Sequence, residues 1–165
     1  MATRCAVVCA EIRSASMRGE GGPMPRLQNI EALQQASLRF KARDLDGHLK
    51  LYSNSVLHHG FSSRLRPGLP GLKDHYTALL AGFPDMRVEI EDIIADGEKV
   101  MHRFMFFGTH KGEFQGIAPT GKLVRAAGVH IHLFKDGVVI EAWQVLDTYA
   151  FLSEIGAVSK VRDTR

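Results

Sequence analysis

The chain has 165 residues, which is the length of one domain and enough to bury a hydrophobic core. Apolar residues make up 45% and charged residues 24%, as in ordinary globular proteins. The formal charge is +3, but the lysines and arginines are scattered, whereas nucleic-acid-binding domains gather them on one face. No apolar stretch reaches the roughly 18 residues that a membrane-spanning helix needs. We therefore expect neither a nucleic-acid partner nor a membrane partner.

The beginning of the chain differs in composition from the rest. It contains both cysteines, Cys5 and Cys9, and the breaker-rich run Gly19–Pro23. We expect a disordered leader over residues 1–25, one domain over residues 26–158 and a tail over residues 159–165. Since that domain has no cysteine, it can hold neither a disulfide nor a thiolate site. This composition fits a reducing compartment, and we expect a cytoplasmic protein.

The first half of the domain is predicted to be mainly helical. Apolar residues recur at helical spacing from Leu27 to Phe40, which is typical of an amphipathic helix. Asp44 is a suitable N-cap for a second, short helix. A loop rich in proline and glycine then separates a short strand from a third helix. The elements expected here are helices at about 27–42, 45–52 and 72–83 and a strand at about 53–61.

The second half is predicted to be an antiparallel sheet followed by a short helix. Apolar and charged residues alternate from Arg87 to Ile94, the period of a half-buried strand. Asp-Gly pairs at 96–97 and 136–137 each separate two β-patterned runs, and such a pair indicates a hairpin because both turn positions need a positive φ. Asp147 can cap the last helix. The expected strands are at about 88–94, 100–107, 123–134 and 138–146.

The order of these elements, helices first and sheet second, indicates an α+β fold rather than a doubly wound α/β fold. The segment at 100–107 is apolar on both faces. One of its faces can lie under the helices. The other face must then line a cavity or contact a partner subunit.

Several pieces of the chain carry a resemblance to a known family. They are Ala81–Val88, Gly108–Lys122, Gly128–His130, Phe134–Gly137, Glu141–Trp143 and Asp147. On these pieces, of which Gly108–Lys122 is the most specific, the chain resembles the SnoaL-like polyketide cyclase family of the nuclear-transport-factor-2-like superfamily over most of residues 27–156. The resemblance implies a cone-shaped, curved antiparallel sheet that the N-terminal helices close around an apolar pocket. It also implies a homodimer formed through the outer face of the sheet.

Three residues are candidates for catalysis. His130 matches a histidine that lines the pocket in the cyclases, where it can shuttle a proton or hold an enolate oxygen, unless it is only a core or interface residue. Arg103 falls where related epoxide hydrolases carry a pocket arginine, which stabilises an oxyanion or binds a carboxylate; an interface or rim arginine is the alternative. Gln144 stands where the cyclases carry the catalytic aspartate. An amide can only donate and accept hydrogen bonds, so the usual acid is missing.

Further substrate-binding residues follow from strand alternation and from the resemblance. Only one of the adjacent histidines His58 and His59 can face the pocket, and we expect His58. By analogy, His110 lies in the loop at the pocket mouth. Arg103 shares its predicted face with two large apolar side chains, and His130 shares its face with a second histidine, for which a core role is favoured. The expected substrate-binding set is His58, Met105, Phe107, His110 and His132.

Two functions remain open at this point. The first is an enzyme of the cyclase or isomerase type, acting by general acid–base chemistry on a small, largely apolar molecule such as a polyketide or terpenoid. The second is a non-catalytic module that binds such a molecule, which the amide of Gln144 favours; a pure dimerisation domain and an epoxide hydrolase-like activity are further alternatives. No metal is expected, because the histidine spacings follow no ligand motif. Members that look like this chain need no cofactor, and none is expected.

Overall fold

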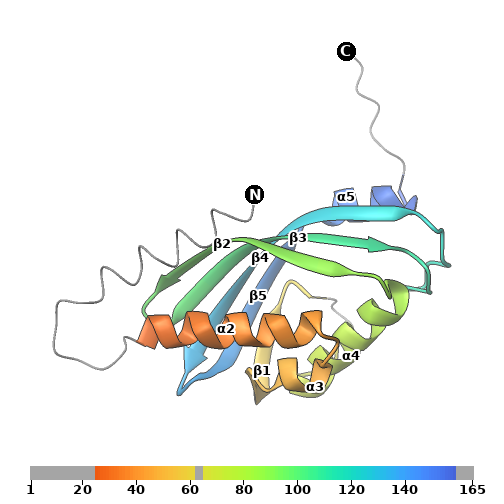
Figure 1. Cartoon of the computed structure of the whole chain (residues 1–165). Helices are drawn as coiled ribbons and strands as arrows, with labels where there is room; N and C mark the ends of the chain where they lie inside the picture. Colours follow the sequence, from red (N-terminus) through yellow and green to blue (C-terminus); the bar gives the residue numbers. More distant parts are fainter. Residues whose placement is uncertain (1–24, 62–64, 159–165) are drawn as a thin grey trace.

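The computed structural model describes residues 25–61 and 65–158 of the chain (Figure 1). The expected leader, apart from Pro25, and the expected tail lie outside the described residues, as do both cysteines. The elements in chain order are α2 (Pro25–Lys41), α3 (Leu45–Leu49), β1 (Tyr52–His59), α4 (Gly68–Gly82), β2 (Arg87–Asp96), β3 (Lys99–Thr109), β4 (Leu123–Lys135), β5 (Val138–Leu146) and α5 (Thr148–Ile155). None of these described helices is long and apolar enough to cross a membrane.

The five strands form one curved sheet with the order β1-β5-β4-β3-β2. Strands β2 to β5 pair antiparallel with their neighbours, whereas β1 runs parallel to β5 at one edge. Figure 1 shows α2 lying across one face of the sheet, with α3 and α4 at one end of it. The α+β fold class is therefore confirmed. The parallel pairing of the first strand is an addition that the sequence pattern does not indicate.

The two predicted hairpins are present, but they turn differently. Asp136 and Gly137 form the second turn, with φ angles of +51° and +80°, as the Asp-Gly signal predicts. In the first hairpin, Asp96 is still paired with Lys99 as the last residue of its strand. The turn therefore lies one residue later than expected, and Gly97 takes its positive φ of +55°.

The helix ends follow from local chemistry. The carboxylate of Asp44 accepts a hydrogen bond from the Gly47 N–H at 2.8 Å, and Asp147 caps α5 in the same way through Ala150, so both predicted caps are confirmed. Helix α4 begins at Gly68, earlier than expected, and it includes the proline that indicates a loop. Pro70 lies in the first turn, where a helix leaves its N–H groups unpaired and tolerates proline.

The core is divided between the two ends of the sheet. One cluster joins α2, α3, α4 and β1, and it includes Leu33, Val56 and Leu72. The other is aromatic and joins the end of α4, the loop after β3 and α5, with Phe83 and Phe151 among its members. Residues of both clusters line a cavity on the inner face of the sheet, which is the face that α2 covers.

Candidate functional site

The cavity on the inner sheet face has a volume of about 1020 Å³. Side chains from helices α2 to α5 and from all five strands line it, and most of them are apolar or aromatic. A space of this size accommodates a molecule with several fused rings. The polar groups that reach into it are therefore the main candidates for chemistry.

Three histidines meet on the inner face and form what we call the histidine cluster: His102, His130 and His132. His102 and His130 are directly opposite each other on β3 and β4. The ring centroid of His102 lies 5.1 Å from that of His130 and 5.4 Å from that of His132. The ring centroids of His130 and His132 are 5.6 Å apart. The ring of Phe104 packs against His130 at 4.8 Å. Strand alternation places all of these rings on one face, so the cluster follows from the register of β3 and β4.

Several ring nitrogens in the cavity have no hydrogen-bond partner within the described part of the chain. The cluster nitrogens of this kind are Nδ1 of His102, Nε2 of His130 and Nδ1 of His132. On α3, His48 donates from Nδ1 to the Ala36 carbonyl at 2.9 Å. Its Nε2 also has no hydrogen-bond partner among the described residues. Since buried polar groups are normally hydrogen-bonded, these nitrogens can serve a molecule in the cavity.

The cluster is electrically neutral near pH 7. Burial lowers the pKa of His102 to about 4, and a nearby histidine adds to the shift. Burial together with His102 lowers the pKa of His132 to about 3. The pKa of His130 is also held well below its usual value, by burial first and then by His102 and His132. A proton on one ring disfavours a proton on the others, because the rings are so close.

Tyrosine hydroxyls complete the polar end of the cavity. The Tyr52 hydroxyl lies 3.3 Å from Nε2 of His132, within hydrogen-bonding distance. Burial raises the pKa of Tyr52 well above its usual value and that of Tyr76 to about 12. Both hydroxyls therefore stay protonated and can act as neutral donors.

Gln144 lies directly opposite His130 on β5 and also lines the cavity. Its main chain is in close contact with Gly60, just after β1. A Cβ atom on Gly60 would lie 1.9 Å from the Gln144 carbonyl oxygen, and the φ of Gly60 is +75°. Only glycine permits this approach. The sequence thus holds the end of β1 against the strand that carries Gln144.

Two of the three catalytic candidates share the cavity, and the third does not. His130 and Gln144 line it, as does His132 from the substrate-binding set. Arg103 lies on the outer face with its side chain 56% exposed, and it forms an ion pair with Glu91. The expectation of a pocket arginine is therefore wrong for this chain.

Met105 and Phe107 are on the outer face with Arg103, so their expected places in the pocket are corrected as well. Their sequence neighbours Phe104 and Phe106 line the cavity instead. The cause is that β3 is apolar on both faces, so alternation alone cannot decide which face is inside. A shift of one residue exchanges the two faces of a strand.

The remaining two predicted residues lie near the cavity but do not line it. His58 points to the same side as Phe61, with ring centroids 5.8 Å apart, and its Nε2 lies 3.2 Å from the Arg66 carbonyl oxygen. As expected, His59 takes the other face, where it contacts Glu141. His110 is fully buried against Phe83 rather than at the cavity mouth, a correction that follows from the tight packing of its loop.

Sequence reasoning missed His102, His48 and His75, all of which line the cavity. Burial lowers the pKa of His75 to about 4, with a smaller contribution from a neighbouring histidine. For His75 the sequence does contain a signal. His75 follows Leu72 by three positions and so lies on the apolar face of its helix. For His102 the signal would have been its position across from His130, which needs the strand register. Among the described residues, no group of three or more His, Cys, Asp or Glu side chains is arranged to hold a metal ion.

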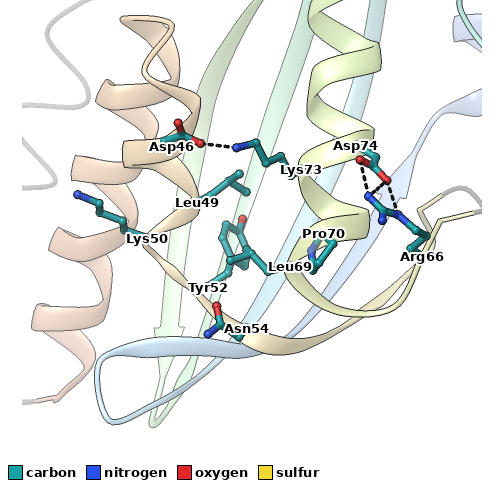
Figure 2. Close-up of a pocket in the computed structure, with 10 residues that line it drawn as sticks. All are labelled: Asp46, Leu49, Lys50, Tyr52, Asn54, Arg66, Leu69, Pro70, Lys73 and Asp74. Atoms are coloured by element: carbon teal, nitrogen blue, oxygen red, sulfur yellow. Dashed lines mark hydrogen bonds and ion pairs between the residues drawn. The ribbon is translucent and has the colours of Figure 1, made fainter.

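A second, shallower depression of about 550 Å³ lies between α3, β1 and α4 (Figure 2). Its charged groups are largely paired with each other. Lys73 donates to Asp46 at 2.7 Å, and Arg66 binds both carboxylate oxygens of Asp74 at 2.8 and 2.9 Å. Tyr52 lines this depression as well as the large cavity. Among the described residues that line the depression, none is an acid–base group comparable to the histidine cluster.

Comparison with known proteins agrees with this architecture. AclR, a proposed hydroxylase from Streptomyces galilaeus, is 27% identical, with a TM-score of 0.74 over 84% of this chain and 87% of that chain. IdmH, a proposed polyketide cyclase from Streptomyces antibioticus, is 26% identical, with a TM-score of 0.66 over 78% of this chain and 99% of that chain. A proposed SnoaL-like polyketide cyclase from Jannaschia sp. CCS1, at 24% identity, shares the fold with a TM-score of 0.73 over 85% of this chain and 99% of that chain. No curated protein sequence matches the chain.

The sequence profile of one family matches most of the chain. It is that of the SnoaL-like polyketide cyclases, and it covers residues 31–155, from within α2 to the end of α5. The matched range includes every residue described above as part of the cavity. The chain therefore belongs to the SnoaL-like polyketide cyclase family.

Proposed function

We propose that the protein is a cofactor-independent enzyme that uses general acid–base chemistry on a small, largely apolar molecule, in the manner of a polyketide cyclase or isomerase. One observation carries this proposal: a neutral His130, with an unpartnered Nε2, faces Gln144 across the strands of an apolar cavity. A neutral imidazole can accept a proton, and an amide can hold the oxygen on which charge develops.

The chemistry that fits this pair is an intramolecular aldol closure. His130 takes a proton from a carbon next to a carbonyl group, and the electron pair of the C–H bond forms an enolate. The enolate oxygen accepts a hydrogen bond from the Gln144 amide. The enolate carbon then attacks a second carbonyl of the same molecule, and protonated His130 returns the proton to the new alkoxide. An isomerase would use the same first step and return the proton to a different carbon.

The test compares residues on the two faces of the sheet. Purified protein is incubated with a panel of aromatic keto aldehydes that can close a ring by aldol addition, and product formation is followed by mass spectrometry. We expect His130→Ala to lower the rate by about 100- to 10,000-fold, the usual contribution of a general base. Arg103→Ala is the matched control and should leave the rate within about twofold, because its side chain lies outside the cavity. A rate that His130→Ala leaves unchanged would show that His130 is not the base.

A second candidate function is binding without turnover, and Gln144 favours it. The family resemblance places an aspartate there, whereas the only carboxylate among the side chains that line the described cavity is Glu89, paired with Arg87. The epoxide hydrolase-like alternative has less support, because its expected arginine is on the outer face. Under the binding hypothesis, ligand raises the melting temperature in a saturable way but yields no product. Product formation that appears only in Gln144→Asp would support this second function.

We also propose that the outer face of the sheet forms a homodimer and that the protein acts in the cytoplasm. No element of the described residues covers this face, where Val145 is 68% exposed beside half-buried large side chains of β3 to β5. The half-buried members are Met101, Met105, Phe107, Ile131 and Trp143. An apolar area of this kind is typical of an interface. In sedimentation, Val145→Asp should shift the protein from dimer to monomer, whereas Leu38→Asp, on α2, should not. A wild-type monomer would contradict the proposal.

A further inference from the structure

The rim of the large cavity carries a charge that its interior lacks. The charged side chains in the lining are Lys41, Arg43, Arg87 and Glu89. Arg87 donates to Glu89 at 2.9 Å, so these two cancel each other. Lys41 and Arg43 have no carboxylate partner within the described part of the chain, and both are exposed where α2 ends. The rim is therefore cationic, while the histidine cluster inside is neutral.

The backbone conformation at Arg43 is unusual for a residue other than glycine. Arg43 follows the end of α2 with a φ of +65°, and the Asp44 N–H closes the helix by donating to the Arg39 carbonyl at 2.9 Å. Helices that end in this way usually place glycine at the left-handed position, because a side chain there costs about 1 kcal/mol. An arginine at such a position is a departure that its guanidinium can explain.

That guanidinium is fixed at the cavity rim. It donates to the Pro84 carbonyl at 2.8 Å and to the Met86 carbonyl at 2.9 Å, at the junction of α4 and β2. Both acceptors are neutral, so they position the cation without cancelling its charge. Five N–H groups are available on a guanidinium, and the side that faces the cavity can hold a carboxylate.

We propose that the substrate of this cavity carries a carboxylate that binds Arg43 and Lys41 at the rim, while its uncharged, oxygen-bearing body extends to the histidine cluster. This inference rests on the proposed function, because it names the substrate class for the same cavity. A carboxylate is placed at the rim because Lys41 and Arg43 are the only uncompensated cations among the described residues that line the cavity. The unpartnered ring nitrogens inside suit hydroxyl and carbonyl groups.

The first experiment compares an acid with its ester. The probes are 3-hydroxy-2-naphthoic acid and its methyl ester, and their dissociation constants are measured by calorimetry at low salt. We expect the acid to bind about fivefold more tightly, which is the scale of an exposed ion pair. Raising the salt from about 20 mM to about 300 mM should remove most of the preference. Equal binding of acid and ester, or tighter binding of the ester, would overturn the proposal.

Two variants then locate the carboxylate. Lys41→Gln removes one rim cation, and Arg43→Gly removes the other while suiting the backbone conformation. Each should weaken binding of the acid about threefold and leave binding of the ester within about twofold. Lys50→Gln is the matched control, because Lys50 is exposed and lines the separate depression of Figure 2. If both variants weaken acid and ester equally, the two side chains only support the structure and the proposal fails.

The outcomes also separate this inference from the proposed function. Ester binding with no preference for the acid contradicts only the rim carboxylate and leaves the enzyme proposal intact. Acid-selective binding by a protein that converts no keto aldehyde supports the rim site and favours the binding function. If neither probe binds, the cavity does not accept hydroxylated aromatic molecules, and the proposed carboxylate site is rejected.

Discussion

The two faces of strands β3 and β4 differ sharply, although they are built by residues that alternate along the same two strands. On the inner face, His102, Phe104 and His130 point into a cavity whose interior is neutral. On the outer face, their neighbours Arg103 and Ile131 belong to an open surface that combines ion pairs with apolar side chains. The difference teaches that composition does not decide which face is the site. Coverage by the helices does, because it encloses one face and removes its polar groups from water.

Acid should destabilise the protein through its inner face. In the folded protein the pKa of His102 is about 4 and that of His132 about 3, whereas unfolded histidines titrate near 6.5. Between these values the unfolded chain binds more protons than the folded one. Stability is therefore fully present above about pH 6.5 and is lost as the pH falls toward 4, by up to roughly 3 kcal/mol for each such histidine. Urea unfolding at a series of pH values measures this loss.

One substitution on each face tests whether the acid sensitivity comes from the inner face. His102→Gln should make the pH dependence shallower by about one proton, since one buried titrating group is removed. Met101→Leu, which changes the adjacent outer residue, should leave the slope unchanged. A slope that does not respond to His102→Gln would mean that the inner face is not the source of the acid sensitivity.

Large-to-small substitutions at adjacent positions should also separate the two faces. Phe104 is 4% exposed and packs against His130, whereas Met105 is half-buried on the outer face. Phe104→Ala should lower the free energy of unfolding by about 3 kcal/mol, and Met105→Ala by about 1 kcal/mol or less in the monomer. Chemical denaturation below the concentration at which dimers form gives both values. Equal losses would contradict the assignment of the faces.

A smaller effect is expected where β1 ends beside the inner face. Gly60→Ala places a methyl group against the Gln144 carbonyl and also strains a positive φ, so we expect a loss of about 2 kcal/mol. Gly137→Ala is its control, because φ is +80° there but nothing lies within 4 Å of an added Cβ. That variant should lose only about 1 kcal/mol. Thermal denaturation distinguishes the two, and a larger loss at Gly137 would contradict the close approach.

The sequence predicts the order and type of the elements better than it predicts which face of each strand points inward. The boundaries of β5 match the prediction, and the Asp136-Gly137 turn fixes the hairpin before it, because turn chemistry is local. The phase of β3 does not follow from its residues, since Met101, Phe104 and Met105 give no alternation. It depends on pairing with β4 across a long connection, so the position of Arg103 could be inferred only from the resemblance to epoxide hydrolases, and that inference is wrong. His130 and Gln144 could be placed because β4 and β5 form a short hairpin.

Tyr52 separates the large cavity from the depression in Figure 2, and it lines both. Its side chain therefore forms part of the wall between the two spaces. Its hydroxyl is bound to His132, so the same ring that closes the wall also restrains the cluster. We expect that shortening this side chain would bring the two spaces into contact and would remove the hydrogen-bonding partner of His132. Solvent would then reach the histidine cluster from the side of the depression.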